Sequence, residues 1–186
     1  LFLFLIAAIS DWFDGYLARL WKQESKFGQM LDPIADKAMV IIALLVITGF
    51  SGMNPWILLP STIILFREVF VSGLREFLGN SASLLQVTKL AKWKTAFQMI
   101  AIATLFTQGI FQHYLDLELW GMDKSALTLA ISNASAETVG STWIYWEAYA
   151  LWILGVLFLW LASLLTLVSG IDYFRKSIPY LKDNNL

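Results

Sequence analysis

Long apolar segments constrain this chain more than any other feature of its sequence. They cover residues 38–50, 55–66, 96–111 and 148–168. Each can form most of a bilayer-spanning helix, which needs about 20 apolar residues. The composition, 58% hydrophobic and 15% charged, leaves too little polar surface for a soluble protein that buries these segments as helices. The sequence therefore predicts an all-α fold, a polytopic transmembrane helix bundle.

We expect a single integral membrane domain over residues 1–186, with spans at residues 1–21, 29–50, 55–79, 92–112 and 143–174. The chain opens with LFLFLIAAI, so its first residue already lies in an apolar run. This run lacks the positive segment and the small-residue cleavage site of a signal peptide. We interpret it as the end of a transmembrane helix whose beginning is absent.

The distribution of lysine and arginine indicates how the bundle is oriented. With alternating spans, all of the 13 basic residues except Lys124 fall on one side of the membrane. Cytoplasmic loops carry the excess of Lys and Arg, so this side is expected to face the cytoplasm. No segment resembles a basic nucleic-acid-binding patch interleaved with base-stacking aromatics, so we expect no nucleic acid partner.

Four aspartates lie at these cytoplasmic ends: Asp11, Asp14, Asp32 and Asp36. At 100° per residue, Asp14 lies about 60° from Asp11, and Asp32 shares a helix face with Asp36. Pro33 is expected in the first turn of that second helix. The intervening stretch is long enough for the second helix to return beside the first, so the two acidic faces can converge.

Converging carboxylates repel one another, and each is costly inside a membrane. A bound divalent cation resolves both problems. Because the donors are carboxylate oxygens and no cysteine is present, Mg²⁺ or Mn²⁺ suits the site better than zinc does.

Small residues lie on the same stripe of the first helix as the acids. Gly15 and Ala18 either let a bulky ligand approach the helix backbone or allow close packing of a neighbouring helix. Their spacing is equally compatible with both interpretations. Arg19 would suit phosphate oxygens. Metal, carboxylates and arginine at a membrane edge suggest phosphoryl chemistry on a lipid-borne diphosphate.

These positions carry a resemblance to a known family. The string Asp11-x2-Asp14-Gly15-x2-Ala18-Arg19-x8-Gly28-x3-Asp32-x3-Asp36 resembles the signature of the CDP-alcohol phosphotransferases. The resemblance implies a six-helix membrane fold, usually a homodimer, with the signature on the second and third helices. The five expected spans would then be helices two to six, and the first helix would be absent from this chain.

The resemblance also implies residue roles. Asp11, Asp14 and Asp32 would be primary ligands of two divalent ions, Mg²⁺ or Mn²⁺. Asp36 would be the general base that takes the proton of the attacking alcohol, and would also contact metal. The nucleotide-binding residues for CDP-diacylglycerol would be Asp11, Gly15, Ala18, Arg19 and Gly28.

Two further segments bear on the acceptor. REVFVSGLREF at 67–77 and KLAKWKTAFQM at 89–99 are similar to bacterial family members that use sn-glycerol 3-phosphate. The expected products are phosphatidylglycerophosphate and CMP, made in phospholipid biosynthesis at the cytoplasmic face of the bacterial inner membrane.

A doubly charged acceptor needs cations around it, and four basic residues could surround its phosphate: Arg67, Arg75, Lys92 and Lys94. The same residues could instead anchor the helices at lipid headgroups. Glu68 and Glu76 could neutralise the two arginines.

Two alternatives stay open. A related enzyme of the same family could use inositol phosphate, serine or phosphatidylglycerol as its acceptor. A cation or proton transporter would also place aspartates inside a membrane. The acids of this chain, however, cluster at one edge, and the opposite half of each span is apolar.

Overall fold

The computed structural model of this protein describes residues 26–79, 89–118 and 139–182, together with Phe2, Phe4, Ile6 and Ser10. The elements in these ranges are all helices: α2 (Lys26–Phe50), α3 (Pro55–Leu78), α4 (Lys89–Glu118) and α6 (Val139–Lys182). The all-α prediction is therefore confirmed. The expected span 1–21 lies almost wholly outside the described residues.

A tight turn reverses the chain between α2 and α3. Gly52 supplies a positive φ of 63°, which glycine adopts without steric cost. Asn54 caps α3, because its side-chain oxygen accepts a hydrogen bond of 3.0 Å from the backbone N–H of Trp56. Pro55 follows at the first helical position, where its missing N–H is not needed. The two helices are thus joined by a short and well-capped connection.

The position of Pro33 corrects the sequence analysis. We expected Pro33 in the first turn of its helix, but α2 begins at Lys26, so this expectation was wrong. Proline has no N–H to donate to the carbonyl four residues earlier, which removes one bond from the helical ladder. Membrane helices tolerate such positions because neighbouring groups can satisfy the freed carbonyl. Interior prolines also occur in α3, at Pro60, and in α6, at Pro179.

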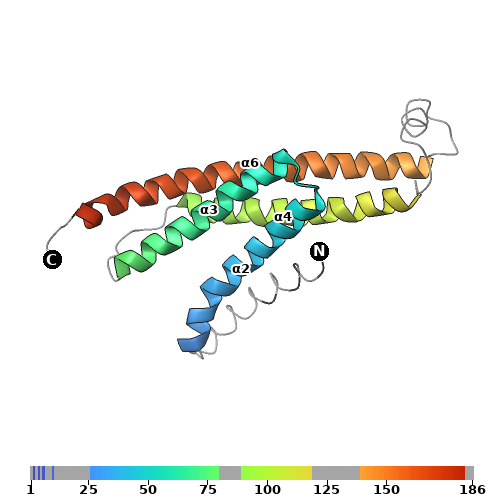
Figure 1. The fold of residues 1–186 in the computed structure, drawn as a ribbon. Helices are drawn as coiled ribbons and strands as arrows, with labels where there is room; N and C mark the ends of the chain where they lie inside the picture. Colours follow the sequence, from blue (N-terminus) through green and yellow to red (C-terminus); the bar gives the residue numbers. More distant parts are fainter. Residues whose placement is uncertain are drawn as a thin grey trace.

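The four helices differ in how closely they pack (Figure 1). Helices α4 and α6 run side by side over much of their length, and α3 packs mainly against α6. Helix α2 meets the others near its C-terminal end and leans away toward its N-terminal end. The acid-bearing half of α2 is therefore on the part of the helix that diverges from the bundle.

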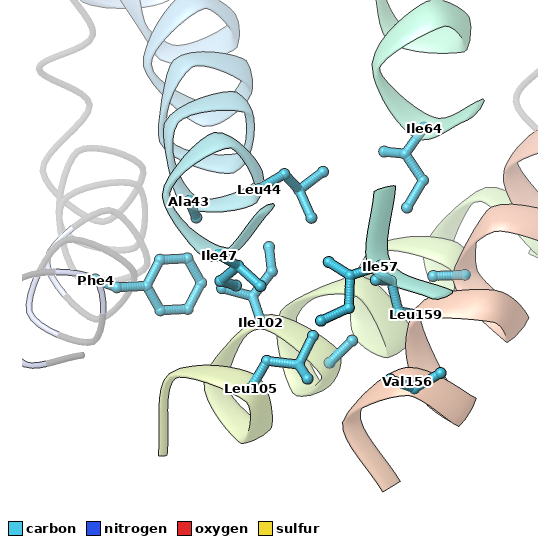
Figure 2. Close-up of a cluster of buried hydrophobic side chains, with 12 residues drawn as sticks. Phe4, Ala43, Leu44, Ile47, Ile57, Ile64, Ile102, Leu105, Val156 and Leu159 are labelled. Atoms are coloured by element: carbon cyan, nitrogen blue, oxygen red, sulfur yellow. The ribbon is translucent and has the colours of Figure 1, made fainter. Parts of the chain in front are cut away.

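One buried core joins all four helices (Figure 2). Leu44 of α2, Ile64 of α3, Ile102 of α4 and Leu159 of α6 are each 0% exposed. Close-packed apolar side chains of this kind hold membrane helices together mainly through van der Waals contact.

The outward faces are suited to lipid. Helix α3 and residues 145–181 of α6 are long and apolar enough to cross a membrane. Large apolar side chains point outward on α3, including Phe66 at 68% exposure and Phe77 at 76%. A water-facing helix would not present such a surface, and these faces are consistent with the expected membrane bundle.

The contact between α4 and α6 gives a test of this packing. A Cβ atom at Gly155 would lie 2.6 Å from Leu105 Cδ2 and 2.7 Å from its Cγ. Both distances are too short for van der Waals contact, so the side chain of Leu105 or the two helices would have to move. We expect Gly155→Ala to lower the free energy of unfolding by about 1–3 kcal/mol through overpacking. Thermal unfolding of the purified protein in detergent measures this.

Gly109 provides the matched control for that substitution. A Cβ atom there would meet nothing within 4 Å. Gly109→Ala should therefore leave stability unchanged or raise it, because alanine favours helix over glycine by about 1 kcal/mol. Equal melting temperatures for the two variants would contradict the close approach of α4 and α6.

Candidate functional site

The described part of the aspartate signature lies on α2. Asp32 and Asp36 are four residues apart in this continuous helix, so they occupy one face, about one turn apart. The side chain of Asp36 is exposed. The residues of the signature that precede Lys26 lie outside the described residues: Asp11, Asp14, Gly15, Ala18 and Arg19.

The donors on α2 fit a divalent metal in their chemistry. Two carboxylates on one face offer hard oxygen ligands, which Mg²⁺ and Mn²⁺ prefer. Within the described ranges, no group of three or more His, Asp or Glu side chains could hold a metal ion by itself. Asp32 and Asp36 would therefore need further ligands from another segment to complete a site.

A second group of polar residues lies beside this face, and we call it the cation cluster. It consists of Glu68, the two basic residues that contact it, Arg67 and Lys94, and Arg75 nearby. These residues come from α3 and α4. The three basic residues outnumber the one carboxylate of the group, which favours an anionic ligand.

Glu68 lies at the centre of the cation cluster. Arg67 Nη1 donates to Glu68 Oε1 at 3.2 Å, and Lys94 Nζ donates to the same oxygen. The three side chains are only 15%, 14% and 9% exposed for Arg67, Glu68 and Lys94. The expectation that Glu68 neutralises Arg67 is confirmed, and Glu68 also joins α3 to α4.

Helix α6 helps to place the arginine. Arg67 Nη2 donates to Ser169 Oγ at 3.4 Å. A Cβ atom at Gly170 would lie 2.9 Å from Arg67 Cγ, so glycine leaves room for the arginine side chain at this point. The Nε of Arg67 is buried without a hydrogen-bond partner in the described part of the chain.

Arg75 lies farther along α3, over a buried aromatic ring. Its guanidinium carbon is 5.2 Å from the ring centroid of Tyr173 on α6, within the range of a cation–π contact. Its charge is close enough to act on both Arg67 and Lys94. Arg75 therefore adds to the positive potential of the cluster without touching Glu68.

Lys37 links the cation cluster to the aspartate face. It directly follows Asp36 in α2, and its Nζ donates to Ser72 Oγ on α3 at 2.6 Å. Ser72 Oγ donates in turn to the backbone oxygen of Glu68 at 2.5 Å. The turn of α2 that carries Asp36 is thus placed beside the turn of α3 that carries Glu68.

Part of this arrangement was predictable from the sequence. The structure brings Arg67 and Lys94 together and places Arg75 nearby, whereas the side chain of Lys92 lies outside what is described. Lys37, Ser72 and Ser169 were missed. A signal existed for Lys37, which is adjacent to a signature aspartate, but no pattern in the sequence marks the two serines.

Comparison with known proteins adds independent information. The profile of the family described as CDP-alcohol phosphatidyltransferase matches residues 1–168. No solved structure gives a significant match to the chain.

Curated relatives cover most of the chain. A protein of Cereibacter sphaeroides is 60% identical over 182 residues, which are 97% of this chain and 82% of the relative. A protein of Wigglesworthia glossinidia brevipalpis is 34% identical over 92% of this chain and 74% of the relative. A protein of Haemophilus influenzae is 41% identical over 62% of each. All three are named CDP-diacylglycerol–glycerol-3-phosphate 3-phosphatidyltransferase.

Proposed function

The chain belongs to the CDP-alcohol phosphatidyltransferase family, and from that premise we propose that it transfers the phosphatidyl group of CDP-diacylglycerol to sn-glycerol 3-phosphate. The products are phosphatidylglycerophosphate and CMP. The observation that carries the choice of acceptor is the 60% identity, over 97% of the chain, to a relative named for this reaction. The enzyme is a membrane-associated transferase, and we place its active site at the cytoplasmic face of the bacterial inner membrane.

The cation cluster supports an acceptor that carries a phosphate group. Arg67 and Lys94 converge on one carboxylate oxygen, so both can donate to a single anionic group placed beside it. Arginine suits this role because its planar guanidinium donates two parallel hydrogen bonds to phosphate oxygens. Arg75 and Lys92 would contribute further positive charge. Serine lacks a phosphate group and would not use this excess of cations.

The aspartate face supports the transfer step. Asp36 acts as the general base and takes the proton of the acceptor hydroxyl as that oxygen bonds to the phosphorus of the phosphatidyl group. The bond between this phosphorus and the oxygen of CMP breaks, and CMP leaves. Lys37 places Asp36 beside the cation cluster, so one substrate can be held by its phosphate while its hydroxyl is deprotonated.

The metal and nucleotide assignments follow the family signature. Two divalent ions, Mg²⁺ or Mn²⁺, would be held by Asp11, Asp14, Asp32 and Asp36 and would neutralise charge on the diphosphate when bound. The cytidine end would lie against Asp11, Gly15, Ala18, Arg19 and Gly28. We also propose that the protein works as a homodimer.

An assay of CMP release tests the proposed function. Membranes that contain the protein are incubated with CDP-diacylglycerol and, in parallel, with glycerol 3-phosphate, inositol phosphate, serine or phosphatidylglycerol. We expect release with glycerol 3-phosphate, dependent on Mg²⁺ or Mn²⁺ and abolished by EDTA. Faster release with another acceptor would replace the proposed substrate. No release with any acceptor, together with metal-dependent ion flux in proteoliposomes, would favour a transporter.

A further inference from the structure

The contact between Lys37 and Ser72 spans the place where α2 and α3 separate. Helix α2 packs into the core through Leu44 and Ile47, which are near the turn to α3. Toward its N-terminal end, α2 leans away from the other helices (Figure 1). At a rise of 1.5 Å per residue, Lys37 and Ser72 lie about 20–25 Å from that turn. A hydrogen bond at this distance restrains the angle between the helices far more than one beside the turn.

The same contact lies between the two parts of the proposed active site. On α2, Lys37 is next to Asp36 in sequence. On α3, Ser72 is bonded to the backbone of Glu68, whose carboxylate holds Arg67 and Lys94. A short path of bonded groups therefore runs from the base-bearing helix to the phosphate-binding cations.

We propose that Lys37 and Ser72 are positioning residues, which set the distance between Asp36 and the cation cluster. This inference rests on the proposed function. The acceptor is a small molecule whose phosphate and reacting hydroxyl are joined by a short carbon chain, so the distance between them is limited. If α2 tilts, the phosphate stays bound but the hydroxyl no longer meets the base. A misplacement of the reacting groups by about 1 Å can lower the rate of reaction by as much as about 10²-fold.

A kinetic test replaces, one at a time, the two residues that form the hydrogen bond between α2 and α3. We expect Ser72→Ala and Lys37→Met each to lower kcat about tenfold. The KM for glycerol 3-phosphate should change less than twofold, since Arg67 and Lys94 remain in place. The double variant should be no slower than the slower single variant, because both changes cut the same contact. Lys37→Arg, which keeps a cation able to reach the hydroxyl, should restore most of kcat.

Thr62 supplies a matched control on the same helix. Its hydroxyl donates to the carbonyl four residues earlier, that of Leu58, at 2.8 Å, as Ser72 does to Glu68, but the side chain is exposed. Thr62→Ala should keep wild-type kcat. Independent, additive losses in the double variant would overturn the proposal. So would a rise in the KM for CDP-diacylglycerol in Lys37→Met alone, because Lys37 would then be a ligand contact.

A measurement without turnover separates this inference from the proposed function. The chain has no cysteine, so spin labels can be attached at Ile34→Cys on α2 and Phe77→Cys on α3, both at exposed positions. We expect Ser72→Ala to broaden the distance distribution between the labels, and Thr62→Ala to leave it unchanged. An unchanged distribution in Ser72→Ala would refute the restraint, whatever reaction the enzyme catalyses. A broadened distribution in a protein that releases no CMP would refute the proposed function alone.

Discussion

Asp36→Asn should lower the rate of CMP release by about 10³-fold, the middle of the range for loss of a general base. Asparagine keeps the shape of the side chain but cannot accept the proton of the acceptor hydroxyl. Binding of CDP-diacylglycerol should be largely retained, because the other signature aspartates remain. Steady-state kinetics of CMP release, combined with equilibrium binding of the nucleotide, measures both quantities.

Asp172 is the control for this substitution. It is an aspartate near the C-terminal end of α6, and its carboxylate pairs with Lys176 one turn away at 2.7 Å. Both side chains are more than 40% exposed, so the pair contributes little to stability. Asp172→Asn should leave kcat unchanged. If Asp36→Asn loses nucleotide binding in parallel with turnover, Asp36 acts mainly as a metal ligand.

Arg67→Gln should raise the KM for glycerol 3-phosphate by about thirtyfold. A hydrogen bond to a charged group contributes about 1.5–3 kcal/mol, and 2 kcal/mol corresponds to a factor of about 30. The KM for CDP-diacylglycerol should change little, because the diphosphate is held elsewhere. Arg67→Lys should recover only part of the affinity, since lysine lacks the planar pair of donors. Initial rates at varied concentrations of both substrates measure these effects.

Arg175 tests whether Arg67 acts merely as a membrane anchor. It is an exposed arginine near the C-terminal end of α6, on the side of the membrane expected to be cytoplasmic. Arg175→Gln removes the same charge without touching the cation cluster, so the KM for glycerol 3-phosphate should stay at its wild-type value. An unchanged KM in a folded Arg67→Gln protein would show that the acceptor phosphate binds elsewhere.

Features that depend on local sequence were predictable. The lengths of the apolar segments determined where α2 and α3 run, because a bilayer requires about 20 apolar residues in succession. The spacing of Asp32 and Asp36 determined that they share a helix face. The expectation for Pro33 failed because α2 begins at Lys26, ahead of the span that the apolar pattern indicated, so the proline falls beyond the first turn.

The sequence by itself determined the class of fold, the acidic face of α2 and the family signature, since each depends on residues close together in the chain. Only the tertiary structure decided which charges meet. Glu68 contacts Lys94 across 26 residues, Lys37 contacts Ser72 across 35, and Arg67 contacts Ser169 across 102. Such contacts depend on how whole helices pack, and no periodicity within one helix specifies its partner or the angle between them.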